Sequence, residues 1–386
     1  MKIAIVAHDD LSVWLNRRGL IKELIAMGHT VDVLCEGGRY IERIKALGAT
    51  FVPIKFPRFI SPVKDLVGMF CLYRIFIRYR YDIVHLFHIK LIVYGAIAAK
   101  MAGINSLIAS STGAGILTNN FSDWKKIQVQ RIVKMLYAFS VPLIDRMSFQ
   151  NGTDRELFCL KGIVKPENAV VVRGSGVNIE EYSERALDHG TVQRLRSQIP
   201  GISERVVVTM VAMVVEPKGV REFIEASKVV ERIKPGLVLF LLFGDLEPNN
   251  PANLPPEYVR SQESEAFRWM GWTDNVKEAL SISDIAVLPS YREGTPRALL
   301  EGMAMAKPIV TTDVPGCRNV IEHGGNGFMV PVRNHIELAK AIQVLAEDSE
   351  MRRKFGKRSY EKVLEEFEEN LIVRQTIREL YGMEPR

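Results

Sequence analysis

Residues 284–313 read DIAVLPSYREGTPRALLEGMAMAKPIVTTD, and the alternation of residue types within them indicates the fold class. Two short apolar segments, 284–290 and 307–313, are separated by a loop and by apolar residues at helical spacing. A strand, a helix and a second strand in this order are typical of a β-α-β unit, in which the two strands are parallel. The sequence therefore predicts a parallel sheet, with the loop from Tyr291 onward at the carboxyl end of one strand.

The same alternation extends over the rest of the chain in two series. Short apolar segments recur from KIAIVA near the start to RMSFQ at 146–150, and again from RVVVTMVAMV at 205–214 to GFMVPV at 327–332. A length of 386 residues also exceeds what one hydrophobic core usually supports. We therefore predict an α/β protein with two Rossmann-like parallel-sheet domains, 1–175 and 176–365, which face each other across a ligand-binding cleft.

Composition excludes several other classes. With 47% apolar and 25% charged residues, the chain has the composition of a folded globular protein. Its four scattered cysteines lack the spacing and the His neighbours of a zinc site and indicate no disulfide framework. The first residues are a poor signal peptide because acidic residues follow only five apolar ones. No apolar run reaches the roughly 18 residues of a membrane span, so we expect a cytoplasmic protein without an integral membrane segment.

Basic residues are concentrated in the first part of the chain. Residues 1–175 hold 24 Lys and Arg against 13 Asp and Glu, a formal charge of +11, whereas residues 176–386 have a formal charge of −5. Much of the excess lies between Lys55 and Val84, where basic and aromatic residues are interleaved. This segment is either an amphipathic helix with a solvated basic face or a surface for anionic lipid head groups. No recognition motif for nucleic acid accompanies the charge, so we predict no nucleic-acid partner.

Two carboxylates of the opening stretch have unusual positions. Glu293 lies in the loop, whereas Glu301 lies among apolar residues, on a helix face that should be buried. Thr295 and Pro296 have the residue types of an N-cap and a first helical position, which places Glu301 roughly 9 Å along the helix axis. The amide groups at a helix start bind anions. The two carboxylates are therefore predicted to flank an anion site.

This arrangement would suit a nucleotide sugar. A carboxylate accepts hydrogen bonds from paired hydroxyls, so Glu301 would bind a ribose, the amides of residues 294–297 a diphosphate, and Glu293 a hexose. The alternative is structural, with Glu293 as a partner of the helix dipole and Glu301 as an exposed residue without a role. A charge among apolar neighbours is costly unless it has a partner, which favours the functional interpretation.

The residues around these carboxylates resemble the signature of glycosyltransferase family 4, the retaining enzymes with a GT-B fold. The resemblance includes the seven residues between the two glutamates and the flanking sequences TTDVPGC and NGFMVP. It implies two Rossmann-like domains and a C-terminal helix, 366–386, that packs back on the first domain. Three further segments resemble the branch that assembles capsular polysaccharides and lipid-linked oligosaccharides: YDIVHLFHIK (81–90), SFQNGTDRELF (148–158) and VVRGSGVNIEEY (171–182).

The resemblance implies a role for each matching residue of the donor site. Glu301 would bind the ribose hydroxyls, and Glu293 would act as a catalytic residue on the hydroxyls of the transferred sugar. The backbone between them would contact the diphosphate or the sugar at three positions: Gly294, Thr295 and Pro296.

The resemblance is incomplete at the diphosphate. Lys218 matches the family's catalytic Lys, but Met213 stands where the family usually has an Arg. Arg297 and Arg173 are candidate substitutes, because the charge of a leaving diphosphate must be neutralised. Trp272 lies where the family's uracil-contacting loop falls, although a structural tryptophan is an alternative.

On the acceptor side, the resemblance implies a set of residues in the first domain. SSTGAG has Thr where many members have His, and VHLFHIK has its second His one position later than the usual His-x-His. A single His near a strand end is more often structural than catalytic, so both interpretations stay open. The predicted acceptor-side residues are Asn16, Arg17, His85, His88, Thr112 and Gly113.

These features predict a retaining hexosyltransferase that needs neither a metal ion nor a cofactor. The sequence lacks the Asp-x-Asp of metal-dependent transferases before a strand end, and helix amides with basic side chains can stabilise a departing diphosphate. The expected reaction moves a hexose or N-acetylhexosamine from a nucleotide sugar, with UDP favoured, to a polyprenyl-diphosphate-linked or other membrane glycan. It would take place at the cytoplasmic face of the membrane, in surface polysaccharide or glycoprotein glycan assembly.

Three other functions are alternatives to this one. A UDP-sugar epimerase would share the fold and the donor, and an inactive scaffold subunit would explain Met213. A nicotinamide-dependent dehydrogenase is disfavoured because no GxGxxG follows the first strand.

Overall fold

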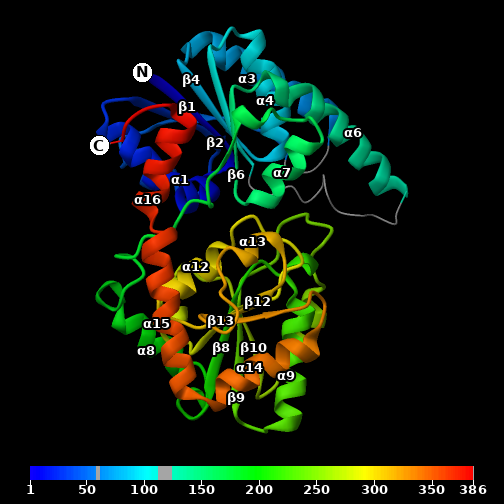
Figure 1. Cartoon of the computed structure of the whole chain (residues 1–386), viewed down its shortest axis with the longest axis vertical. Helices are drawn as coiled ribbons and strands as arrows, with labels where there is room; N and C mark the ends of the chain where they lie inside the picture. The colour runs from blue at the N-terminus through cyan, green and yellow to red at the C-terminus, as the bar shows by residue number, and fades with distance from the viewer. Residues whose placement is uncertain (58–60, 112–123, 386) are drawn as a thin grey trace. The chain divides into compact units, whose positions relative to one another are not determined.

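The computed structural model describes residues 1–57, 61–111 and 124–385, which form two compact units (Figure 1). One unit contains Met1–Ser175 together with Asn370–Arg386, and the other contains Gly176–Glu369. The chain therefore leaves the first unit once and returns to it at its C-terminal end. Each unit is built around a parallel sheet, which confirms the predicted α/β class with two Rossmann-like domains.

The first unit contains a seven-stranded sheet. Its strands are β1 (Lys2–Asp9), β2 (Thr30–Glu36), β3 (Thr50–Pro53), β4 (Ile83–Phe87), β5 (Ser106–Ser111), β6 (Arg146–Phe149) and β7 (Ala169–Val171). They lie in the order β3-β2-β1-β4-β5-β6-β7, and all neighbouring pairs are parallel. The order reverses between β1 and β4, which makes this the switch point where Rossmann-like sheets bind ligands.

Helices cover both faces of this sheet. They are α1 (Asp10–Ala26), α2 (Ile41–Lys45), α3 (Pro62–Tyr79), α4 (Ile89–Met101), α6 (Trp124–Ser140) and α7 (Gly152–Leu160). One core cluster joins α1 and α2 to residues of the C-terminal segment, and a second joins α3, α4, α6 and α7. Because both faces are covered, most strand residues are buried and apolar.

The second unit contains a six-stranded sheet. Its strands are β8 (Val206–Val211), β9 (Val238–Phe243), β10 (Phe267–Gly271), β11 (Ile285–Leu288), β12 (Ile309–Thr312) and β13 (Gly327–Val330). They are all parallel, in the order β10-β9-β8-β11-β12-β13. The switch point therefore lies between β8 and β11.

The helices of the second unit follow its strands. They are α8 (His189–Ser197), α9 (Val220–Ile233), α10 (Pro256–Ser261), α11 (Val276–Ser281), α12 (Arg297–Ala304), α13 (Pro315–Arg318), α14 (His335–Glu347) and α15 (Ser349–Glu366). The larger core cluster includes residues of α9, α12 and α14, and a smaller one lies with α8 and α11.

The C-terminal segment differs in its bounds from the predicted helix 366–386. Helix α16 extends over Glu369–Thr376 and is followed by a π-helical turn, Ile377–Tyr381. Gly382 then adopts a φ of +66°, which suits glycine and ends the helical conformation. Within the described ranges, no helix has the length and hydropathy needed to cross a membrane.

Candidate functional site

The loops after β8 and β11 meet at the switch point of the second sheet. Lys218 Nζ donates a hydrogen bond to Oε1 of Glu293 at 2.6 Å, and the Ser290 hydroxyl donates to the same oxygen at 2.6 Å. The Glu293 side chain is only 10% exposed. The fold therefore joins two residues that are 75 positions apart in the sequence, at the edge where parallel sheets bind ligands.

Two glycines allow the backbone of this site to pack closely. Gly219 has a φ of +76°, and a Cβ at this position would overlap the carbonyl oxygen of Pro289. Gly316, in α13, lies so close to the loop after β11 that a Cβ would overlap the carbonyl oxygen of Gly294. Neither position accommodates a side chain, so the shape of the loop depends on both glycines.

Helix α12 begins two residues after the predicted N-cap. Pro296 is the actual N-cap, with φ −75° and ψ 98°, and its extended ψ excludes it from the helix. The assignments of Thr295 as the N-cap and Pro296 as the first helical residue were therefore wrong, and the side chain of Pro296 forms no capping hydrogen bond. Glu301 is the fifth residue of the helix, so it lies about 6 Å along the axis rather than 9 Å. Proline has no side-chain acceptor for the first-turn amides, as suits an anion site.

The buried charge of Glu301 has a partner in the same helix. Oε1 of Glu301 accepts a hydrogen bond from Nε of Arg297 at 2.7 Å, and the two side chains are 7% and 17% exposed. Burial alone would lower the pKa of Arg297, but the Glu301 carboxylate outweighs this effect, and the net shift is upward. Arg297 therefore carries its positive charge. Arg297 was a candidate for neutralising the diphosphate charge, but its Nε donates to Glu301 instead.

The remaining residues of the predicted donor site are on other elements. Met213 is half-buried in the loop after β8. Trp272 follows β10, two strands from β8, and its indole Nε1 donates to Asp274 at 3.2 Å. Arg173 is exposed and belongs to the first unit. Within the second unit, the structure thus brings Lys218 to Glu293 but does not bring Trp272 to them.

Sequence reasoning missed two residues next to Glu293. Ser290 lies at the end of β11 and binds the carboxylate directly; its place between strand and loop was a usable signal. Cys317 is buried in α13, where burial and then the charge of Glu293 raise its pKa to about 12. The thiol is therefore neutral at physiological pH. No sequence pattern indicated this proximity, because Cys317 follows a different strand.

At the switch point of the first sheet, α1 supplies two predicted acceptor-side residues, Asn16 and Arg17. The Arg17 guanidinium lies 3.9 Å from the centroid of the Phe87 ring, at the end of β4. It also donates a hydrogen bond to the Ser175 hydroxyl at 2.7 Å. These contacts hold a positive charge over the carboxyl end of β4.

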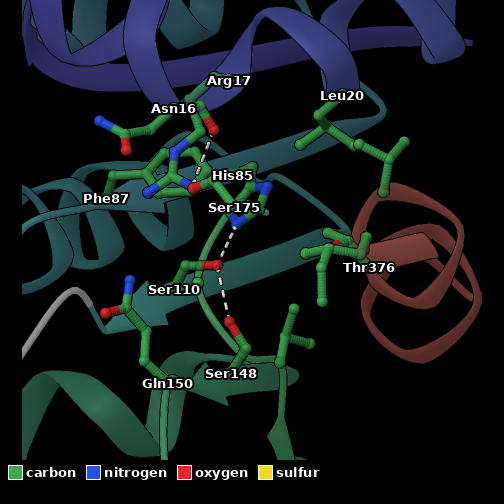
Figure 2. A pocket seen from close by; sticks show the side chains of 14 residues that line it. Asn16, Arg17, Leu20, His85, Phe87, Ser110, Ser148, Gln150, Ser175 and Thr376 are labelled. Carbon is green, nitrogen blue, oxygen red and sulfur yellow. Dashed lines mark hydrogen bonds between the residues drawn. The ribbon is translucent and has the colours of Figure 1, made fainter. Parts of the chain in front are cut away.

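His85 lies within β4 and is the centre of a buried hydrogen-bond chain. Its Nδ1 is 2.9 Å from the Tyr381 hydroxyl, and its Nε2 is 2.8 Å from the Ser110 hydroxyl, which in turn lies 2.7 Å from that of Ser148. Figure 2 shows the Ser110 and Ser148 part of this chain. Burial, with a further contribution from the Arg17 charge, lowers the pKa of His85 well below its usual value. The neutral ring uses both nitrogens in this chain, which corresponds to the structural interpretation of this histidine.

A small polar cavity adjoins this chain (Figure 2). Its free volume of about 20 Å³ has room for roughly one water molecule. Asn16 and Arg17 line it together with hydroxyl and carboxamide groups: Ser110, Ser148, Gln150, Ser175 and Thr376. The C-terminal segment thus contributes to the wall of the cavity as well as to the support of His85.

The remaining acceptor-side residues are His88, Thr112 and Gly113. His88 is the N-cap of α4 and has a φ of +68°, and its ring centroid lies 4.9 Å from that of His8 at the end of β1. The two histidines therefore mark the same edge of the sheet. Thr112 and Gly113 lie outside the described residues. In the described ranges, no three His, Cys, Asp or Glu side chains are grouped to hold a metal ion.

Both halves of the chain match known protein families. Residues 204–348 match the family model of glycosyl transferases group 1, and residues 2–145 match that of glycosyl transferase 4-like proteins. The two matches fall on the two sheet-containing units.

Relatives with similar sequences span nearly the whole chain. The N,N'-diacetylbacillosaminyl-diphospho-undecaprenol alpha-1,3-N-acetylgalactosaminyltransferase of Campylobacter jejuni is 26% identical over 379 residues, covering 98% of either chain. The UDP-Gal:alpha-D-GlcNAc-diphosphoundecaprenol alpha-1,3-galactosyltransferase of Escherichia coli is 27% identical over 325 residues, covering 82% of this chain and 80% of that one. The crystal structure of Anabaena Alr3699/HepE in complex with UDP and glucose has a TM-score of 0.80 at 18% identity, covering 99% of this chain and 100% of that one.

Proposed function

The chain belongs to glycosyltransferase family 4 and has the GT-B fold, and from this premise we propose that it transfers a hexose or N-acetylhexosamine, with retention, from a nucleotide sugar to a polyprenyl-diphosphate-linked glycan. The names of the Campylobacter and Escherichia relatives support this acceptor class. UDP in the name of the Escherichia relative and in the Anabaena complex supports a UDP-sugar as the donor.

The observation that supports the donor site is the ion pair of Lys218 and Glu293 beside the start of α12. Both hydrogen bonds of the Glu293 carboxylate fall on Oε1, and Oε2 accepts none from the part of the chain that the structure describes. We propose that Oε2 accepts hydrogen bonds from the transferred sugar. The Lys218 ammonium, 27% exposed, would bind the diphosphate together with the amides of residues 294–297.

We propose that Glu301 binds the ribose. Its Oε1 is held by Arg297, and Oε2 accepts no hydrogen bond from the described residues. The ion pair with Arg297 fixes the orientation of the carboxylate, so that ribose hydroxyls would meet a preorganised acceptor. In this proposal Arg297 acts through Glu301 rather than as the substitute for Met213.

In the proposed reaction, the acceptor hydroxyl oxygen forms a bond to the anomeric carbon as the bond to the diphosphate oxygen breaks. The hydroxyl proton leaves to the departing diphosphate, and attack from the face that the nucleotide leaves preserves the configuration. Negative charge develops on the diphosphate, where Lys218 and the α12 amides would stabilise it. With this stabilisation, the step as proposed uses neither a metal ion nor a cofactor.

The acceptor side is proposed to lie on the first unit, at the edge that carries Asn16, Arg17 and His88. The formal charge of +11 on residues 1–175 would attract this unit to anionic lipids, at about 1 kcal/mol per basic residue near the surface. We propose that the enzyme works at the cytoplasmic face of the membrane, where a polyprenyl-linked acceptor and a nucleotide sugar are both accessible.

One experiment tests the transfer reaction. The protein is incubated with UDP- and GDP-sugars and an undecaprenyl-diphosphate-linked N-acetylhexosamine, and the free nucleotide and the glycolipid are measured by mass spectrometry. Release of nucleotide with a glycolipid heavier by one sugar is the expected result. An epimerised free sugar without glycolipid would identify an epimerase. Donor binding without any turnover, across several lipid-linked acceptors, would favour an inactive scaffold.

A further inference from the structure

Helix α3 has an apolar stripe on its exposed side. Its inner side packs into the core through Leu72 and Phe76. The outer side carries five large apolar residues that are 47% to 76% exposed, at the spacing of one helical face. These residues are Val63, Leu66, Val67, Phe70 and Ile77. A helix of this kind normally exposes polar residues, so the stripe requires another explanation.

Helix α6 repeats the pattern. Tyr137 anchors the helix in the core, whereas four large apolar residues on the outside are 53% to 67% exposed. Their positions in the sequence again follow helical spacing. They are Trp124, Ile132, Met135 and Phe139.

The two helices flank α4 on the same face of the first sheet (Figure 1). Helix α4 contacts both α3 and α6, and all three contribute to one core cluster. The two stripes thus belong to one layer of helices. We call the nine exposed apolar residues of α3 and α6 the apolar surface.

The charges beside the apolar surface are basic. Lys64, Arg74 and Arg78 are exposed on α3, and Arg131 is exposed on α6. The single acid of α3, Asp65, is buried and forms an ion pair with Lys90 at 2.5 Å. The sequence of α6 contains neither Asp nor Glu.

The apolar surface with basic residues beside it fits an anionic lipid leaflet better than a second copy of the chain. Basic residues next to Trp, Phe and Leu are typical of helices that lie in the interface of an anionic lipid leaflet. A second copy of the chain would bring the same basic residues face to face, and like charges oppose such pairing.

We propose that α3 and α6 insert the apolar surface into the boundary between head groups and acyl chains of an anionic leaflet. The proposal rests on the lipid-linked acceptor of the proposed function, and it adds apolar insertion to the electrostatic attraction of the basic unit. Salt screens the attraction between charges but not the burial of apolar groups. Binding should therefore persist in part at high salt.

The test measures flotation with vesicles of phosphatidylglycerol and phosphatidylcholine, at low salt and at about 1 M salt. Two variants remove the stripes separately: L66S/V67S/F70S on α3 and I132S/M135S/F139S on α6. Each should lower the vesicle partition coefficient at high salt by at least about tenfold, since burying one large apolar side chain alone can change a partition that much. The variant R74E/R78E should lose binding at low salt and retain the salt-resistant part.

The matched control is I233S/I336S/V344S, which removes three exposed apolar residues from the second unit. It should partition as the unaltered protein does. Unchanged high-salt partition of both stripe variants, with unaltered thermal unfolding, would overturn the proposal. A dimer in the unaltered protein that dissociates in the stripe variants would also overturn it, because a second copy would then cover the surface.

A further measurement separates this proposal from the proposed function. The stripe variants are assayed with a short-chain prenyl-diphosphate acceptor in solution, where membrane binding is not needed. Transfer at the rate of the unaltered protein, with loss of transfer on vesicles, supports the apolar surface. If the unaltered protein transfers no sugar to either acceptor but its vesicle binding depends on the stripes, the proposed reaction fails while the membrane surface stands.

Discussion

Replacing Glu301 with Gln removes one negative charge from α12 and keeps the size of the side chain. In the structure, Glu301 Oε1 accepts from Arg297 Nε at 2.7 Å, and the two side chains are 7% and 17% exposed. The oxygen of Gln can still accept this bond, but the charge of Arg297 then has no counterion in the pair. We expect weaker donor binding together with a modest loss of stability.

The magnitudes follow from the loss of charge. A hydrogen bond to a charged group contributes about 1.5–3 kcal/mol and a neutral one about 1 kcal/mol. With one or two ribose hydroxyls on the carboxylate, E301Q should lose about 1–2 kcal/mol of binding, or about 5- to 30-fold in Kd. Breaking a fully buried ion pair costs about 3–5 kcal/mol. Because the pair is partly exposed and Gln keeps one bond, we expect a stability loss nearer about 1–2 kcal/mol.

The assay is isothermal titration of UDP and of 2'-deoxy-UDP into both proteins. The unaltered protein should bind UDP more tightly, because the deoxy ligand lacks a hydroxyl for Glu301. E301Q should discriminate less between the two ligands. The control variant is E337Q, which neutralises an exposed helical glutamate whose lysine partner, Lys340, lies at 2.7 Å.

Unaltered UDP affinity in E301Q, with undiminished discrimination against the deoxy ligand, would refute the ribose assignment. Glu301 would then be a structural partner of Arg297. The double-mutant cycle with R297M measures that pairing directly from the free energies of unfolding.

Three further predictions follow from the two sites. Replacing Lys218 with Met should lower kcat for nucleotide release by about 100-fold or more, the usual loss when one group that stabilises a leaving anion is removed. A kcat within about twofold of that of the unaltered protein would show that Lys218 has no role in the reaction. Burial and the Glu293 charge raise the pKa of Cys317 to about 12. Iodoacetamide at neutral pH should therefore label the exposed Cys71 and leave Cys317 unmodified. Peptide mass mapping measures the labelling of each cysteine. Burial lowers the pKa of His85 below 6.5, so the stability that its neutral form contributes is present above pH 6.5. This stability is lost as the pH falls, by up to about 1.4 kcal/mol per pH unit. Urea titrations between about pH 7 and 5 should show a shallower decline in the free energy of unfolding for H85Q, and an identical decline would contradict the assignment.

Most of the fold could be predicted from the sequence, because strands and helices leave local patterns of apolar residues. Segments such as DIAVLPS and KPIVTTD are short, apolar and bounded by turn residues, and both became parallel strands, β11 and β12. Burial on both faces of a parallel sheet imposes this composition on every strand. The helix start was less accurate by one residue, because the loop before Pro296 packs against Gly316 of the next helix, and this contact is not visible in the local pattern.

Residue patterns alone were enough to predict the α/β class, the family and the presence of two carboxylates around a helix start. The partner of Glu301 could also have been predicted, because Arg297 lies four residues earlier on the same helix face. Three contacts required the folded chain to be seen: Lys218 with Glu293, Cys317 beside this carboxylate, and Tyr381 of the C-terminal segment with His85. These contacts join distant parts of the chain, and their geometry depends on strand order and loop packing, which local residue patterns do not encode.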